Sequence, residues 1–194
     1  MLKVDNIAIP ELEPISFELA AGECLGVSGA SGCGKTRLLR AIADMDEIEG
    51  GVCVDDLCQT DVAGADWRKQ VAMLPAESQW WFDTVAPHFS DAADYASLGF
   101  PEQVKTWSIA RCSSGEKQRL AILRLLANKP RVLLLDEPTA NLDAENARKV
   151  EALITDYLKA HKAVAIWVSH NHAQLERVAT SRYFDFSKNS MVLI

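Results

Sequence analysis

The sequence lacks a hydrophobic run long enough to span a membrane. Its longest uninterrupted apolar run covers only the six residues from Ala163 to Val168, whereas a transmembrane helix needs about 20. The first residues, Met1 to Asp5, also lack the basic start and apolar stretch of a secretory signal. We therefore expect a cytoplasmic protein without transmembrane segments.

Cysteine patterns typical of metal sites or disulfide scaffolds are also missing. The chain has five cysteines, an odd number, and they form neither a C-x-x-C pair nor a zinc framework with a nearby histidine. We interpret all of them as reduced thiols, most of them buried. They are Cys24, Cys33, Cys53, Cys58 and Cys112.

Positive charge is scarce as well. Twenty Lys and Arg residues face 27 Asp and Glu residues, which gives a net charge of −7. This balance argues against nucleic-acid binding, which depends mainly on cationic side chains at phosphates. The chain has no repeats or low-complexity tracts, and 48% of its 194 residues are hydrophobic. These values predict a single globular domain over residues 1–194.

Short apolar runs alternate with segments of helical periodicity, which predicts an α/β fold with parallel strands covered by helices. The expected strands are 24–28, 70–74, 132–136 and 163–169. The clearest helix covers residues 141–158, with Asp143 as its N-cap. One apolar face of that helix is expected in the core, formed by Ala147, Val150, Ile154, Tyr157 and Leu158.

The two ends and one internal segment follow other patterns. The first twenty residues, with two prolines between short apolar stretches, predict an antiparallel β-hairpin, and residues 182–194 predict another with a turn at 188–190. Residues 85–112 are less regular and predict a small helical insertion.

A phosphate-binding loop is the strongest local motif. Gly29-Ala30-Ser31-Gly32-Cys33-Gly34-Lys35-Thr36 matches G-x-x-x-x-G-K-[ST] between an expected strand and an expected helix. Glycines allow several backbone N–H groups to surround a polyphosphate, and the helix N-terminus adds a partial positive charge. Lys35 is expected to contact the β- and γ-phosphates of a bound polyphosphate, and Thr36 to bind Mg²⁺.

Two carboxylates end the expected strand at 132–136. Asp136 and Glu137 should lie at the carboxyl edge of the sheet, where α/β proteins place their ligands. We interpret Asp136 as part of the Mg²⁺ shell, and Glu137 as the residue that polarises the water attacking the γ-phosphate.

Three more motifs complete an ordered set. Residues 112–119 (CSSGEKQR) are similar to the L-S-G-G-Q signature and the following Q-R, residues 140–143 (ANLD) to the D-loop, and 168–170 (VSH) to the switch-histidine motif. With the two motifs above, the chain resembles the nucleotide-binding subunits of ATP-binding cassette (ABC) proteins along nearly its whole length. The resemblance implies an ABC-type ATPase with a mixed sheet, an N-terminal antiparallel β subdomain and a helical signature subdomain at about 85–128.

The resemblance also implies how the protein works. Two copies would bind ATP head to tail, between the phosphate loop of one and the signature residues Ser113, Ser114, Gly115 and Glu116 of the other. His170 would contact the γ-phosphate, and Asp143 would join the site from the D-loop. A separate transmembrane permease would hold the dimer at the cytoplasmic face of the inner membrane.

The chain departs from the family pattern at several positions. Ala76 stands where the family usually has a Gln that joins Mg²⁺ to the membrane partner, and Ser114 replaces a signature Gly. Trp80-Trp81-Phe82 follows the Ala76 position, and we expect one of these rings to face the partner while the others fill the core.

The cargo and the wider function stay open. Three runs, 82–85, 114–119 and 166–170, look similar to the ATP-binding subunit of a bacterial iron-export transporter, which implies iron as cargo, with another metal, a lipid or a small toxic compound as alternatives. The competing function is a soluble ATP-switched regulator, which the missing Gln favours.

Overall fold

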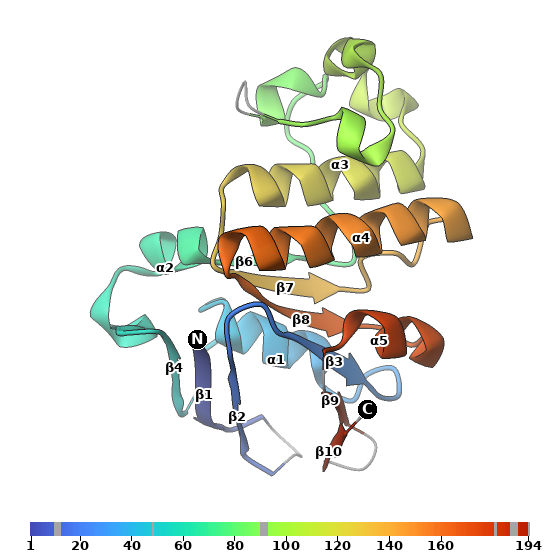
Figure 1. Ribbon diagram of the computed structural model, residues 1–194. Coiled ribbons are helices and arrows are strands. Elements are labelled where there is room, and N and C mark those ends of the chain that lie inside the picture. Colours follow the sequence, from blue (N-terminus) through green and yellow to red (C-terminus); the bar gives the residue numbers. More distant parts are fainter. Residues whose placement is uncertain (10–12, 48, 90–92, 181, 187–189, 194) are drawn as a thin grey trace.

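Two β-sheets and the helices around them form the structure, a computed structural model (Figure 1). It describes all residues except 10–12, 48, 90–92, 181, 187–189 and 194.

The larger sheet has six strands in the order β10-β9-β3-β8-β7-β6. All neighbours are parallel except β9 and β10, which form an antiparallel hairpin. The four expected parallel strands and the C-terminal hairpin are thus confirmed, although most of the turn at 188–190 lies outside the described residues. The bounds are β3 Cys24–Ser28, β6 Val71–Leu74, β7 Val132–Asp136, β8 Val164–Val168, β9 Arg182–Asp185 and β10 Ser190–Leu193.

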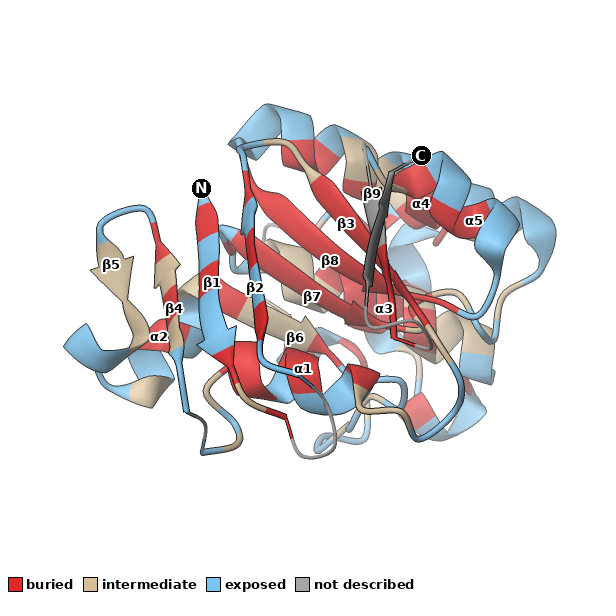
Figure 2. Cartoon of the chain, turned by 90° about the horizontal axis from the view of Figure 1, so that it is seen from below, coloured by how far each residue is buried: buried red, intermediate tan, exposed pale blue. Residues whose placement is uncertain are grey.

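The central strands are apolar along their whole length because both faces of this sheet are covered. In β7, Val132 and Leu134 belong to the hydrophobic cluster on the side of α1, whereas Leu133 and Leu135 belong to the cluster on the side of α3 and α4. Figure 2 shows these strands buried throughout. A continuous apolar run is what a parallel strand between two helical layers requires.

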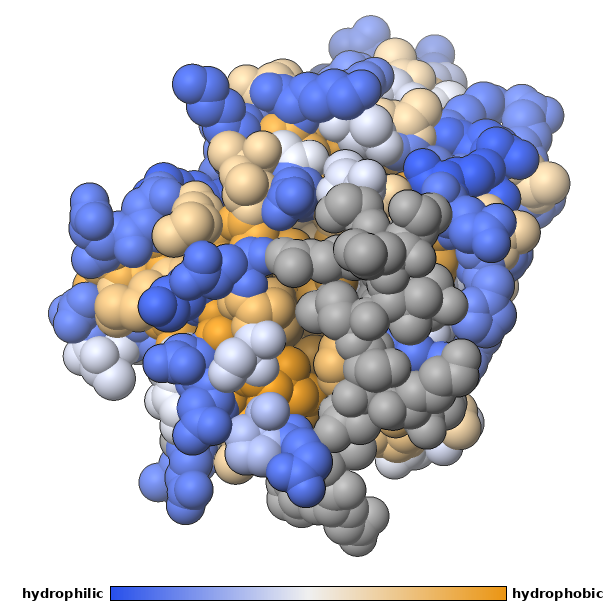
Figure 3. All heavy atoms as spheres, turned by 60° about the horizontal axis from the view of Figure 1, so that its bottom comes forward, coloured by the Kyte–Doolittle hydropathy of each residue, from blue (hydrophilic) through white to orange (hydrophobic). Residues whose placement is uncertain are grey.

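The smaller sheet is antiparallel, with the order β2-β1-β4-β5. Its strands are β1 Leu2–Ile7, β2 Ile15–Leu19, β4 Gly51–Val54 and β5 Leu57–Cys58. Buried and exposed residues alternate in β2, so one face packs on the core and the other meets solvent. The N-terminal hairpin is confirmed, and the β4–β5 hairpin is an addition that the sequence did not predict. Seen from below, hydrophobic atoms are visible between hydrophilic side chains on the left of the view (Figure 3).

Within the described residues, five α-helices lie around the sheets and connect the strands (Figure 1). They are α1 Lys35–Ile42, α2 Gly64–Gln70, α3 Ser114–Ala127, α4 Ala144–His161 and α5 His172–Val178. The expected N-cap of α4 is confirmed, because the Asp143 side chain accepts a hydrogen bond from the Asn146 N–H. The expected apolar face is buried from Val150 onward, while Ala147 is only half-buried.

The irregular segment before α3 contains short 3₁₀-helices. These are η2 Ala86–His88, η3 Ala96–Leu98, η4 Glu102–Thr106 and η5 Ile109–Arg111, and a further one, η1 Gln59–Asp61, follows β5. Leu98 of η3 and Val104 of η4 belong to the hydrophobic cluster that includes α3 and α4. The helical character of this insertion is as expected. The bounds of the helical subdomain, about 85–128, stay a prediction.

One expectation about the cysteines is wrong. Cys53 and Cys58 form a disulfide, since the antiparallel register of β4 and β5 places them opposite each other with Cα atoms 4.0 Å apart. The two cysteines are cross-strand neighbours five residues apart, a spacing that no C-x-x-C motif indicates. Cys24 and Cys112 are buried free thiols, as expected, and Cys33 is half-buried.

Replacing Cys53 by Ser should lower the free energy of unfolding by about 2 kcal/mol, because the unfolded chain regains the entropy that a short closed loop removes. Urea unfolding without reductant measures the difference, and dithiothreitol should bring the wild type to the stability of the variant. Alkylation of all five cysteines in denatured, unreduced protein would contradict the disulfide.

Among the described residues, no helix combines the length and the apolar character that crossing a bilayer requires.

Candidate active site

The phosphate loop lies between β3 and the N-terminus of α1, as the motif requires (Figure 1). Lys35 is buried, and its Nζ donates hydrogen bonds to the carbonyl oxygens of Gly29 and Ala30, both at 2.8 Å. The ammonium therefore lies over the loop backbone.

Gly29 allows this loop to fold tightly. Its φ angle is +147°, and a Cβ there would lie 2.7 Å from the Cβ of Phe186 and 2.9 Å from the Sγ of Cys33. A larger residue would push the loop away from the C-terminal strands. The glycine at this position is therefore required by packing as well as by the backbone.

Thr36 and Asp136 meet across the site although they are 100 residues apart in the chain. The Thr36 hydroxyl donates a 2.8 Å hydrogen bond to Oδ2 of Asp136, which is buried at the end of β7. Hydroxyl and carboxylate oxygens are ligands that Mg²⁺ accepts. The two residues that the sequence predicts as Mg²⁺ ligands therefore lie next to each other.

Glu137 leaves β7 with an unusual backbone. Its φ angle is +48°, a left-handed conformation that is uncommon for residues other than Gly, Asn and Asp. Its Oε1 is buried and accepts no hydrogen bond from the described residues, but it faces Nε2 of His170 at 3.5 Å. Burial raises the pKa of Glu137; His170 and Lys35 oppose this shift, and Asp136 adds to it.

A cavity of about 360 Å³ unites these groups. The structure thus brings together the phosphate loop, both acidic residues and His170, in agreement with their expected proximity. Ala76 and Arg37 also border the cavity, so the chain segment of the missing Gln lies at the site. The lining residues are Ser31, Gly32, Gly34, Lys35, Thr36, Arg37, Ala76, Asp136, Glu137 and His170.

The signature residues lie elsewhere, at the N-terminus of α3. Ser113 Oγ accepts a hydrogen bond from the Glu116 N–H, and the Glu116 carboxylate accepts one from the Ser113 N–H. Gly115 packs under the D-loop, since a Cβ there would lie 2.9 Å from the Asn141 carbonyl oxygen. None of Ser113 to Glu116 borders the phosphate-loop cavity of their own chain.

Asp143 has a local role in the structure. Its carboxylate accepts hydrogen bonds from the backbone N–H and the side-chain amide of Asn146, which lower its pKa. This N-cap fixes the end of the D-loop at the start of α4.

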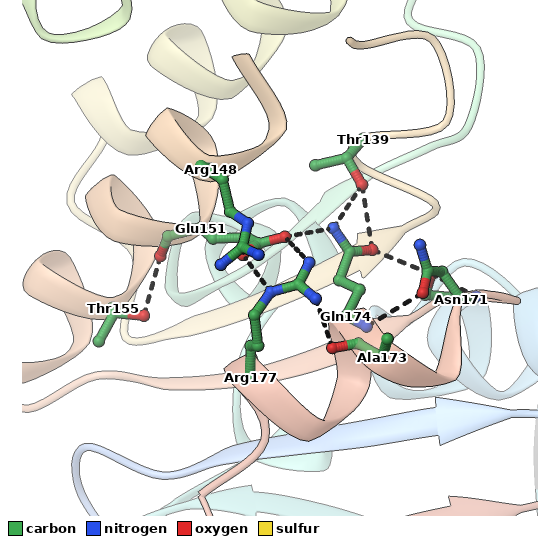
Figure 4. A network of polar contacts seen from close by, with 9 residues as sticks. Thr139, Arg148, Glu151, Thr155, Asn171, Ala173, Gln174 and Arg177 are labelled. Atoms are coloured by element: carbon green, nitrogen blue, oxygen red, sulfur yellow. Dashed lines mark hydrogen bonds and ion pairs between the residues drawn. The ribbon is translucent and has the colours of Figure 1, made fainter. Parts of the chain in front are cut away.

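A polar network behind the cavity was not predicted (Figure 4). Buried Gln174 on α5 contacts Thr139, Ser169 and Glu151, and Arg177 binds the Glu151 carboxylate through Nε at 3.0 Å and Nη2 at 2.8 Å. Thr139 could have been found from the sequence, because it follows Glu137 by two residues and so lies close to the expected site. For Gln174, the only signal is a polar residue on the buried side of a short amphipathic helix.

The network makes stability depend on pH. Burial alone would raise the pKa of Glu151, but hydrogen bonds from Arg177 and Gln174 outweigh it and lower that pKa. A carboxyl group whose pKa is lower in the folded chain than in the unfolded chain stabilises the fold at pH values above its unfolded pKa, which is about 4.3. This contribution disappears as the pH falls through the pKa of the folded chain. At pH 7 we expect wild type to exceed Glu151→Gln by about 2 kcal/mol in free energy of unfolding.

Urea unfolding of both proteins from pH 7 to pH 3 tests this expectation. The difference should shrink below about pH 4. A difference that stays constant over the whole range would mean that the ionised carboxylate contributes nothing.

The comparisons with known proteins agree with this geometry. The family model described as "ABC transporter" matches residues 12–140. The aliphatic sulfonates import ATP-binding protein SsuB 2 of Pseudomonas savastanoi is 33% identical over 165 residues, covering 82% of this chain and 59% of the relative. The probable iron export ATP-binding protein FetA of Escherichia coli is 30% identical over 179 residues, covering 84% of this chain and 80% of that protein.

Solved structures show the same fold. A bacterial Atm1-family ABC exporter with ATP bound has a TM-score of 0.78 at 24% identity, covering 95% of this chain and 36% of that one. The dimeric ATP-binding cassette MJ0796, bound to ADP and Pi, has a TM-score of 0.77 at 21% identity, covering 95% and 94%. The chain spans about three-fifths of the length of the sulfonate import proteins. On the extent of the family match and these identities, the chain belongs to the ABC transporter family.

Proposed function

We propose that the chain is the ATP-binding and hydrolysing subunit of an ABC transporter, which dimerises on ATP and drives a separate transmembrane subunit. The observation that carries this proposal is that one cavity is bordered by five residues together: Lys35, Thr36, Asp136, Glu137 and His170. Lys35, Thr36, Asp136 and Glu137 are the cation, the metal ligands and the base that phosphoryl transfer to water needs, and His170 lies beside the base.

The phosphate loop would bind the triphosphate. Lys35 would exchange its two carbonyl acceptors for β- and γ-phosphate oxygens, and backbone N–H groups at the start of α1 would donate to the same chain of phosphates. Thr36 and Asp136 would hold Mg²⁺, which neutralises negative charge on the phosphates when bound.

Glu137 would act on the attacking water. The unpartnered Oε1 is able to accept a hydrogen bond from that water and orient it, and the raised pKa makes the carboxylate a stronger proton acceptor than an ordinary glutamate. His170, largely exposed, would contact the γ-phosphate with the ring nitrogen that now faces Glu137.

A second copy would complete the site. The signature serine Ser113 is exposed at the N-terminus of α3 and does not border its own phosphate loop. In a head-to-tail dimer these helix termini would meet the ATP bound by the partner copy, where N–H groups and a hydroxyl suit a phosphate. Hydrolysis would then depend on protein concentration.

For the membrane partner we propose a docking surface formed by Trp81 and Phe82, whose rings pack against the buried His88. Trp81 and Phe82 are 64% and 47% exposed, so two rings and not one are available, while Trp80 packs partly against the core. His88 Nε2 accepts hydrogen bonds from the backbone N–H groups of Trp81 and Phe82, both at 3.1 Å. This fixed apolar surface suits an interface hot spot.

The test is purification from detergent-solubilised membranes of the host, with and without ATP. A stoichiometric multi-spanning protein is expected, and the double variant Trp81→Ser, Phe82→Ser should recover much less of it. Recovery of the wild type without any membrane protein would overturn the transport proposal and favour the ATP-switched regulator.

We propose that the cargo is iron and that the direction of transport is export, and this pair should be assayed first. FetA supports it, because the chain spans 80% of that protein but only 59% of SsuB 2. Aliphatic sulfonate import is the competing cargo. Both are tested with the co-purified complex in vesicles.

Ala76→Gln should raise partner-stimulated ATP turnover about fivefold, because one added hydrogen bond at the metal and water contributes about 1 kcal/mol. Ala76 borders the cavity, so the longer side chain reaches the site. Steady-state ATPase assays of the complex measure the change, with Ala76→Met as a control of similar length. Equal rates for all three proteins would contradict the role.

A further inference from the structure

Gln174 links the two loops that carry Glu137 and His170. It is 3% exposed on α5, and its Nε2 donates to Thr139 Oγ1 at 2.8 Å, while its Oε1 accepts from Ser169 Oγ at 3.0 Å. Thr139 lies two residues after Glu137, and Ser169 directly precedes His170. One amide therefore ties together both chain segments.

We infer that Gln174 is a positioning residue for ATP hydrolysis, which keeps the Glu137 carboxylate and the His170 ring at their observed separation. The inference rests on the proposed roles of those two residues. No other side chain in Figure 4 is bonded to both loops within the described part of the chain.

The orientation of the Gln174 amide is fixed by its third partner. Nε2 also donates to Glu151 Oε1 at 2.9 Å, and Glu151 is a carboxylate held on α4 by Arg177. An ionised carboxylate only accepts, so the amide nitrogen must point toward it and the oxygen toward Ser169. Methionine, which has a similar length, would offer neither group.

The linkage should affect the chemical step and not ATP binding. Gln174 does not border the phosphate-loop cavity, but lines a second cavity of about 400 Å³ on the other side of Glu137 and His170. Among the described residues, its hydrogen-bond partners include neither Lys35 nor Thr36. A shift of about 1 Å in a reacting group costs about 10²-fold in rate, so even a small relaxation of the two loops should be visible in kcat.

The experiment is steady-state ATP hydrolysis by the full chain at concentrations that saturate dimerisation. Gln174→Met should lower kcat about 10- to 100-fold, with the KM for ATP within about twofold of wild type. If Gln174→Met does not fold, Thr139→Val is the second variant, because it removes the hydrogen bonds between Thr139 Oγ1 and the Gln174 amide. It should also lower kcat.

Glu151→Gln is the matched control. It weakens the ion pair with Arg177, but its new amide oxygen still accepts from Gln174, so kcat should stay within about twofold of wild type. Gln174→Glu places a second carboxylate against Glu151 and should lose kcat, and the exchanged pair Gln174→Glu with Glu151→Gln should regain it.

Three results would overturn the inference: wild-type kcat in Gln174→Met, an equal loss of kcat in Glu151→Gln, or no recovery in the exchanged pair. Glu137→Gln, measured in parallel, separates this inference from the proposed function. If Glu137→Gln hydrolyses ATP at the wild-type rate, the proposed roles fail; if it is inactive while Gln174→Met is normal, only the positioning role fails.

Discussion

Replacing Glu137 by glutamine is expected to lower ATP turnover by about 10²- to 10⁴-fold, the range attributed to a positioned general base. Glutamine has the same side-chain length as glutamate at the position with φ +48°, but it cannot take a proton from water. Because Lys35, Thr36 and Asp136 are unchanged, the variant should still bind ATP.

The variant should therefore accumulate as an ATP-bound dimer. Steady-state phosphate release measures turnover, and size-exclusion chromatography with Mg-ATP measures the dimer. Asp156→Asn, an exposed change on α4 away from the cavity, is the matched control and should behave as wild type. Turnover at the wild-type rate in Glu137→Gln would assign the base to another residue.

Replacing Lys35 by alanine is expected to weaken Mg-ATP binding by at least about 10²-fold. Each hydrogen bond to a charged group contributes about 1.5–3 kcal/mol, and contacts to both the β- and γ-phosphates would be lost. Titration calorimetry of the purified chain measures the dissociation constant.

Lys69→Ala is the control, since Lys69 is an exposed lysine paired with Asp66 on α2. It should bind Mg-ATP with wild-type affinity. Unchanged affinity in Lys35→Ala would remove the phosphate loop as the nucleotide site.

The parts of the site that the sequence predicts are those that depend on local structure. The phosphate loop needs one strand, one turn and one helix in sequence, and Asp136 follows from the end of an apolar strand. Their meeting in space follows from the rule that parallel strands share a carboxyl edge, and the hydrogen bond from Thr36 to Asp136 agrees with it.

The features that the sequence missed depend on long-range packing. The Cys53–Cys58 pair requires the register of a hairpin whose strands are too short to give a clear alternating pattern. Gln174 becomes significant only because α5 places it between Thr139 and Ser169, which lie 35 and 5 residues away. No local preference encodes such distances.

The carbonyl contacts of Lys35 also have a consequence for anion selectivity. The ammonium has two oxygen acceptors in its own loop, so an anion that binds there must compensate for their loss. A free inorganic phosphate offers few contacts in return, whereas a triphosphate reaches Lys35 and the N–H groups of α1 together. A triphosphate should therefore bind this loop in preference to free phosphate.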